Sequence, residues 1–144
     1  MVNEEEGLMP KIIIQNIEEF KEVVYRKFAA AGFLIVKEIQ DQIMSMDLFQ
    51  TGDFRNSIQS KFENGVLTIE STVPYAYYLE FGTTRHFIKP VNKKALSWEK
   101  GAKRFYSKGH WVEGIKAYAP FRKVILNPTI MANVFKKVGE AKLV

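Results

Sequence analysis

The sequence predicts a protein of mixed α and β structure, with a long helix near its start, antiparallel hairpins in the middle and a shorter helix near its end. Three patterns predict this order: an apolar stripe at helical spacing over residues 17–43, an Asn-Gly turn at residues 64–65, and a helix start at Asn127-Pro128. A chain of 144 residues has room for one hydrophobic core, so we expect a single domain over residues 1–144.

The first helix is expected to begin near Asn16 and to end near Met46. Asn16 is a favoured N-cap residue, and Glu18 and Glu19 place negative charge in the first turn, where it suits the helix dipole. Apolar residues then recur at steps of three and four: Ile17, Phe20, Val24, Phe28, Ala31, Ile35, Ile39 and Ile43. We interpret this stripe as the face that builds the domain core. Residues 1–14 before it are predicted to form an extended N-terminal arm.

A short helix and a hairpin should follow the long helix. Thr51 can cap a short helix whose apolar residues, Phe54 and Ile58, lie four positions apart. Residues 59–62 and 66–73 then flank Asn64-Gly65, a dipeptide that supplies the positive φ angles of a type I′ turn. These signals predict a tight antiparallel pair of strands.

The remaining elements are predicted from prolines, glycines and strand-like runs. Pro74 opens a short aromatic helix that Gly82 stops, and a second hairpin is expected from residues 95–98 and 103–106. Pro120 reopens helical sequence, and Asn127-Pro128 is typical of a cap and first turn for a last helix that ends between residues 138 and 142.

Two long loops are expected on either side of the second hairpin, over residues 82–90 and 107–119. Connections in compact domains are usually shorter, and long loops tend to be functional. We therefore expect these loops to take part in binding.

The charge of the chain, +5 in total, is divided unevenly along it. Residues 1–50 carry five Lys or Arg against nine Asp or Glu, whereas residues 82–123 carry eleven Lys or Arg against Glu99 and Glu113. Such asymmetry indicates either a surface for nucleic acid or a basic side that meets an acidic side on another protein. Both interpretations remain open at this point.

The residue types predict no enzyme. The chain has no cysteine, which excludes a disulfide framework, a zinc-thiolate site and a thiol nucleophile. Neither His86 nor His110 has a second ligand at the spacing of a metal site, and phosphate-loop and nucleophile-elbow motifs are missing from the sequence. We therefore predict no catalytic residue, no cofactor-binding residue and no metal site.

Membrane insertion is not expected either. No apolar run approaches the ~20 residues that span a bilayer. The acidic start of the sequence is the opposite of the basic start of a signal peptide. We expect a protein that is made and used in a cytoplasm, or in something assembled there.

Basic and aromatic residues alternate in the second half of the chain. Five basic residues are candidates for contact with DNA or an acidic partner: Lys93, Lys94, Lys103, Arg104 and Lys108. They interleave with aromatic residues, a combination in which cations hold phosphates while rings stack on bases. We favour the simpler interpretation that this is a hairpin with one buried and one wet face, since alternation puts Leu96 and Trp98 on the same face.

Two strings of residues resemble the paired signature of phage tail-completion proteins, the family of siphovirus tail-to-head joining proteins and minor tail components. The first string is residues 51–57, TGDFRNS, and the second and more specific is residues 73–83, VPYAYYLEFGT. The similarity extends to residues 88–90, 93–98 and 119–122, and so covers about residues 15–135. One departure is the break before Pro128, where the family more often continues its final helix.

The resemblance implies an α+β fold, in which a long N-terminal helix and a C-terminal helix pack on a small antiparallel β-sheet with two long loops. It also implies a structural virion protein of a long-tailed phage, a homo-oligomeric ring of about six copies at the head–tail junction, or neck. Such a ring completes the tail and joins it to the head connector. The alternative is a basic DNA-binding accessory protein of phage packaging, and duplex DNA in the ring lumen would make the two functions compatible.

The same resemblance implies partners and a location. The partners are further copies of the chain, a head connector or stopper protein, and a tail terminator or tail tube protein, with no membrane. The location is the neck or tail of the virion, which is assembled in the host bacterial cytoplasm. An acidic first half and a basic segment would let each copy recognise the next, and the two loops would become ordered between neighbours.

The aromatic helix and the first long loop supply most candidates for the subunit interface. Tyrosine has an apolar body and a polar tip, so it suits a core and an interface equally. We expect the aromatic group of Tyr75, Tyr77, Tyr78 and Phe81 in the core, with an interface anchor as the alternative. The interface candidates are Tyr75, Tyr77, Tyr78, Phe81, Thr83, Arg85, His86, Lys89 and Trp111.

Overall fold

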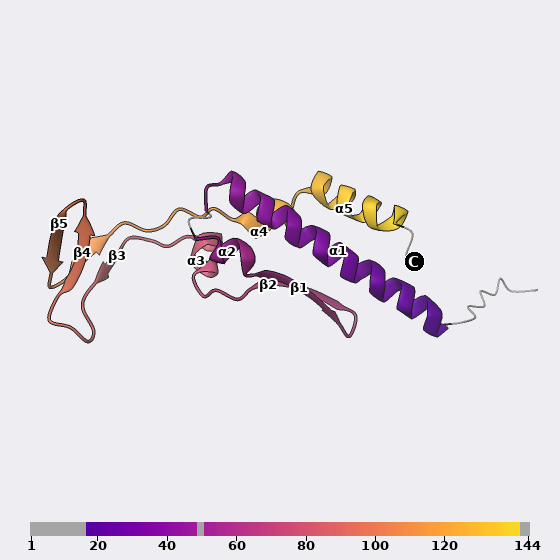
Figure 1. Ribbon diagram of the computed structural model, residues 1–144, viewed down its shortest axis with the longest axis horizontal. Coiled ribbons are helices and arrows are strands. Elements are labelled where there is room, and N and C mark those ends of the chain that lie inside the picture. The colour runs from indigo at the N-terminus through magenta and orange to yellow at the C-terminus, as the bar shows by residue number, and fades with distance from the viewer. Residues whose placement is uncertain (1–16, 49–50, 142–144) are drawn as a thin grey trace, which may run out of the picture.

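The computed structural model describes residues 17–48 and 51–141, and its element order confirms the α+β prediction (Figure 1). Its helices and strands are α1 (Ile17–Ser45), α2 (Asp53–Asn56), β1 (Ile58–Glu63), β2 (Val66–Ser71), α3 (Ala76–Phe81), β3 (His86–Ile88), β4 (Leu96–Lys100), β5 (Lys103–Ser107), β6 (His110–Val112), α4 (Pro120–Ile125) and α5 (Pro128–Glu140). The expected Asn16 cap and the expected arm over residues 1–14 lie outside the described residues.

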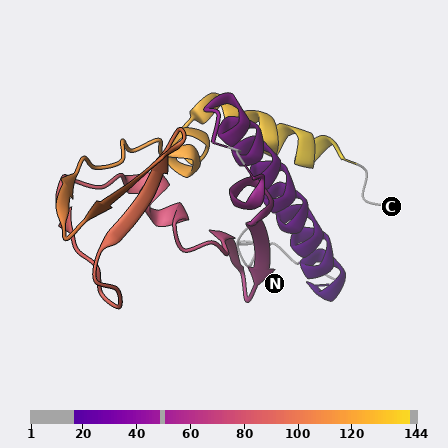
Figure 2. The same ribbon diagram turned by 60° about the vertical axis from the view of Figure 1, so that its left-hand side comes forward.

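The core lies along the C-terminal half of α1. Ala31, Ile35, Ile39 and Ile43 are all at most 3% exposed, on the face of α1 that the apolar stripe predicts. The hairpin β1–β2 and the helix α5 flank α1 on opposite sides, and α4 packs against it as well (Figures 1 and 2). The other buried hydrophobic side chains come from these flanking elements and from α2 and α3: Phe54, Ile58, Ala76, Val124, Val134 and Val138.

The N-terminal half of the stripe, up to Phe28, is not buried, which corrects the prediction that the whole stripe builds the core. Ile17 is 50% exposed and Phe20 is 58% exposed, although both keep the helical spacing of the buried isoleucines. The physical reason is the length of α1. The last turn of α5 is tied to Lys27, whose Nζ donates to the Val138 carbonyl at 3.1 Å, so the first turns of α1 extend past that helix.

The hairpin β1–β2 confirms the predicted turn at Asn64-Gly65. Glu63 pairs with Val66 across the turn, and both Asn64 and Gly65 have positive φ angles, as a type I′ turn requires. The hairpin approaches α1 closely at Gly32, where an added Cβ would lie 2.8 Å from the Leu67 side chain. Glycine at this position therefore sets the distance between helix and hairpin.

Two predicted helix starts have different outcomes. Asn127 caps α5 as expected, because its side-chain oxygen accepts hydrogen bonds from Thr129 N and Ile130 N at 3.0 and 3.2 Å. Thr51 is not the N-cap residue of α2, because Gly52, at φ 78°, occupies that position. From one position further out, the Thr51 hydroxyl still accepts a hydrogen bond from Asp53 N at 3.3 Å, and it donates to the Asp53 carboxylate at 2.8 Å.

Other details of the middle segment also differ from the prediction. Ile58 does not extend α2 but begins β1, and both it and Phe54 are buried in the core. The predicted break between the last two helices is confirmed, since α4 ends at Ile125 and α5 begins at Pro128. The second hairpin is confirmed as β4–β5, with Trp98 opposite Phe105.

The two long loops are only partly irregular. Each contains a three-residue strand, and these strands, β3 and β6, pair with each other antiparallel, with Phe87 opposite Trp111. The sequence does not predict this pairing, because each strand is short and no tight turn connects the two. Residues 82–119 thus form a continuous projection with β4–β5 at its outer end, which we call the basic extension (Figure 1).

Substitution of one residue in each part of the apolar stripe tests where the core ends. We expect Ile39→Ala to lower the free energy of unfolding by about 2–5 kcal/mol, because a fully buried side chain is lost. Phe20→Ala removes a larger but exposed side chain and should cost no more than about 0.5 kcal/mol. Urea unfolding of the monomer measures both, and similar losses would show that the core reaches the start of α1.

Candidate assembly surface

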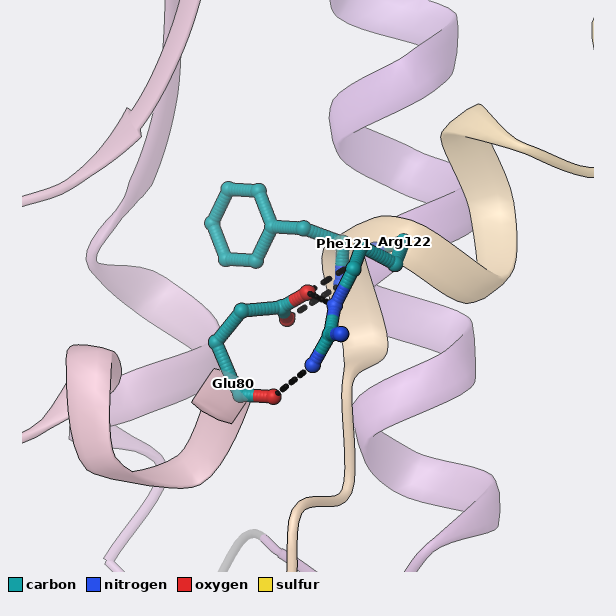
Figure 3. A network of polar contacts seen from close by, with 3 residues as sticks. All are labelled: Glu80, Phe121 and Arg122. Carbon is teal, nitrogen blue, oxygen red and sulfur yellow. Dashed lines mark hydrogen bonds and ion pairs between the residues drawn. The ribbon is translucent and has the colours of Figure 1, made fainter. Parts of the chain in front are cut away.

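The carboxylate of Glu80 connects α3 to the first turn of α4 (Figure 3). Its two oxygens accept hydrogen bonds from Phe121 N at 3.0 Å and from Arg122 N at 3.1 Å. These are N–H groups of a first helical turn, which have no partner inside the helix. Ala119, the N-cap residue of α4, offers no side-chain cap, so Glu80 supplies one from a different element.

The side chain of Arg122 completes this network. Its Nε donates to Glu80 Oε1 at 2.9 Å, and its Nη2 donates to the backbone carbonyl of Glu80. The guanidinium also lies over the ring of Phe81, 4.9 Å from the ring centroid. Glu80 is only 7% exposed. The cost of burying its carboxylate is offset by the ion pair with Arg122 and by the hydrogen bonds that it accepts.

The Glu80 network lies at the root of the basic extension, where the chain leaves α3 and returns to α4. Backbone hydrogen bonds continue the connection outward: Tyr118 N donates to the Leu79 carbonyl, and Thr83 N donates to the Ile115 carbonyl, both at 2.9 Å. The outgoing and returning segments of the chain approach so closely here that a Cβ on Gly114 would lie 1.7 Å from the Thr83 carbonyl oxygen. The root is therefore held at several successive points.

The aromatic residues of α3 are exposed beside this root, which corrects the expectation that they belong to the core. Tyr77 is 64% exposed, Tyr78 49% and Phe81 54%. Their rings contact one another, with centroids 4.8 Å apart for Tyr77 and Phe81. Tyr75, which is 42% exposed, packs instead toward Phe54. The interface alternative is the one that this exposure supports.

A groove of about 530 Å³ opens next to these rings. Apolar side chains from the end of β2, from α3 and from α4 form most of it, and the Glu80–Arg122 pair lies at its edge. Its lining residues are Ser71, Val73, Pro74, Ala76, Tyr77, Glu80, Phe81, Phe121 and Arg122.

The basic extension has almost no interior of its own. None of residues 82–119, all of which the structure describes, is buried. Trp98 stacks on Phe105 and also contacts the ring of His110, 4.9 Å away between centroids, which brings β4–β5 and β3–β6 together. Outside this small cluster, Phe87 and Trp111 pack edge to face and are both more than half exposed.

The charged side chains of the basic extension do not form one cationic face. Lys103 and Arg104 are neighbours in β5 and therefore point to opposite faces of the hairpin. Arg104 is paired with Glu99 across the strands, and Arg85 is paired with Glu113 at 3.2 Å. The two acids of this segment thus neutralise two of its cations locally.

The remaining predicted residues lie in different places. Thr83 is at the root, where its hydroxyl accepts a hydrogen bond from Ile115 N. Arg85 lies over Trp111, 5.3 Å from the ring centroid, so these two candidates do come together. His86 and Lys89 are exposed on or near β3, and the basic residues without a strand position, Lys93, Lys94 and Lys108, lie exposed in the connecting segments.

Neither a metal-ligand cluster nor a membrane-spanning helix is found in the part of the chain that the structure describes. Among residues 17–48 and 51–141, no three His, Asp or Glu side chains come together as metal ligands do. No described helix has the length and apolar character needed to cross a membrane.

Sequence reasoning missed Glu80 itself. Two signals were available: a single acid among the aromatic residues of α3, and a helix beginning Pro-Phe-Arg after an alanine that cannot cap it. Neither signal pairs the two elements, because 40 residues of unpredicted path separate them in the sequence.

Comparison with known proteins gives a match in the first half of the chain. The family model described as "Bacteriophage HK97-gp10, putative tail-component" matches residues 13–82. The match includes residues 51–57 and all of the second string except Thr83, and it ends where the basic extension begins. No curated protein and no solved structure matches the chain.

Two alanine substitutions separate the capping role of Glu80 from its ion pair. Glu80→Ala should lower the free energy of unfolding by about 2–3 kcal/mol, since it leaves two helical N–H groups and a guanidinium without their acceptor. Arg122→Ala should cost only about 1 kcal/mol, because the Arg122 side chain is 46% exposed and the cap remains. Urea unfolding measures both, and equal losses would contradict the capping role.

Proposed function

Because residues 13–82 match the family model of HK97 gp10-like bacteriophage tail components, we propose that this chain forms a ring at the head–tail junction of a long-tailed phage. In this proposal the chain is a structural component of the tail and not an enzyme. In this proposal the ring completes the tail and joins it to the head connector. Its neighbours are a connector or stopper protein on the head side and a terminator or tube protein on the tail side.

The observation that carries the proposal is the amount of large apolar surface that the chain leaves uncovered. Within the described residues, ten hydrophobic side chains are buried, whereas twenty-two large hydrophobic side chains are exposed. Scattered exposed apolar residues are normal, but contiguous aromatic groups such as those of α3 mark contact surfaces. Surface of this kind suits a protein that is completed by its neighbours in an assembly.

The root of the basic extension supports the same function. A subunit of a ring has to present its contacts in a fixed geometry. The Glu80 network and the close backbone contact between Gly114 and Thr83 hold the extension where it leaves the core. The groove and the rings of α3 lie directly beside this root. Contact with a neighbour at this point would therefore bear on a well-ordered part of the molecule.

The alternative, a DNA-binding accessory protein, has less support in the geometry. The candidate cations Lys103 and Arg104 point to opposite faces of the hairpin. A duplex presents a continuous line of phosphates, so binding favours cations gathered on one face. Contact of some basic residues with DNA in a ring lumen is compatible with the ring.

Removal of the chain from its phage tests the proposed role directly. We expect a nonsense mutation in its gene to yield filled heads and complete-length tails that remain separate in electron micrographs. Supply of the intact chain from a plasmid should restore joining. Normally joined virions that lack the chain would contradict the proposal, and labelled chain at the distal end of the tail would place it elsewhere.

Charge reversal in the basic extension tests the DNA alternative. We expect Lys93→Glu combined with Lys94→Glu to leave the affinity for duplex DNA unchanged within about twofold, measured by fluorescence anisotropy at about 0.15 M salt. A DNA-binding protein would instead lose affinity on charge reversal. The logarithm of its binding constant would also fall linearly with the logarithm of the salt concentration, with a slope of about 0.9 for each phosphate contacted. A steep slope that these substitutions reduce would favour the alternative.

A further inference from the structure

The first turns of α1 form an apolar surface that nothing in the described chain covers. Ile17, Phe20 and Val23 are 50%, 58% and 39% exposed, beyond the reach of α5. Three acids lie among them, Glu18, Glu19 and Glu22. We call residues 17–23 the α1 tip. Glu18 and Glu22 contact Lys21 and Arg26 of the same helix, at 2.8 and 3.9 Å, and exposed pairs of this kind open readily to another cation.

The basic extension has the complementary composition. It carries nine Lys or Arg against two acids, and both acids are already paired within it. Its aromatic pair Phe87–Trp111 and the ring of Tyr106 are more than half exposed. Two-stranded sheets are marginal in water unless one face packs on something else, and no residue of the extension is buried. The extension therefore gains stability when another surface covers it.

The two surfaces lie at opposite ends of the molecule. In Figure 1 the β4–β5 hairpin occupies one end of the long axis and the start of α1 approaches the other. Neither surface can cover the other within one copy. Two different, complementary patches at opposite ends are what a head-to-tail contact between identical subunits requires, and such contacts close into rings when the rotation between copies allows it.

We propose that the basic extension of one copy binds the α1 tip of the next copy. The proposal deepens the ring proposed above and rests on it. Cations of the extension meet the acids of the α1 tip, while exposed aromatic side chains cover Ile17, Phe20 and Val23. A second copy fits the extension better than duplex DNA, because the extension exposes large apolar rings and divides its cations between two faces.

Two double variants of the full chain, each disabling one surface, test the contact. The tip variant combines Phe20→Ser with Glu22→Lys, and the extension variant combines Trp111→Ser with Lys103→Glu. A control variant combines Phe33→Ser, which removes an exposed ring further along α1, with Lys136→Glu on α5. Circular dichroism and thermal unfolding check that each variant remains folded.

Sedimentation velocity at low salt, over rising protein concentration, gives the result. The unmodified chain and the control should associate beyond the dimer, and the tip and extension variants should each associate about tenfold or more weakly. An equal mixture of the tip and extension variants should form dimers and stop there, because only one working pair of surfaces is left between them. This outcome distinguishes head-to-tail contact from a symmetric contact.

Three results overturn the inference. If the unmodified chain does not associate at any concentration, the two surfaces do not bind each other. If both variants associate as the unmodified chain does, copies meet through other surfaces, and the ring itself still stands. If the mixture stays monomeric while the extension binds a duplex oligonucleotide added as a probe, the extension is a DNA-binding surface and not a contact between copies. Normal head–tail joining without the chain is a separate result, and it overturns the ring.

Discussion

The contact between the Glu80 carboxylate and the first turn of α4 determines how the two halves of this chain meet. α4 begins after an alanine in a left-handed conformation, and two of its first N–H groups find their acceptors on α3. This contact places Val124, which is fully buried, against α1, and from there α5 follows after the Asn127 cap. It also brings both ends of the basic extension to one point, so a segment without a core of its own is attached to a stable base.

The chain divides its apolar residues between folding and contact. Isoleucines of α1 and side chains of α4, α5 and β1 form a single core cluster, whereas the aromatic residues are mostly left at the surface. A small domain can fold with so limited a core because its long helix offers one continuous face on which several other helices and strands of the chain pack. The aromatic residues on α3, on the basic extension and at the α1 tip are then available to other molecules, which is consistent with the tail-component family model that matches residues 13–82.

Local signals in the sequence were reliable at one turn and one helix start. Asn64-Gly65 turns the first hairpin, and Asn127-Pro128 starts the last helix, because dihedral preference and capping act within a few residues. The stripe on α1 shows the limit of such signals. Phe20 and Ile39 share its periodicity, yet only Ile39 is buried, since periodicity identifies a face of a helix and not the length over which another element packs on it.

By itself, the sequence determined the helices, both hairpins, the uneven charge and the resemblance of residues 51–57 and 73–83 to phage tail proteins. Tertiary structure alone decided that β3 pairs with β6, that Lys103 and Arg104 serve opposite faces, that the rings of α3 are exposed, and that Glu80 caps α4. The difference is physical. Turns and caps are contacts between near neighbours, whereas strand pairing across twenty residues and a cap supplied from α3 depend on the path of the whole intervening chain.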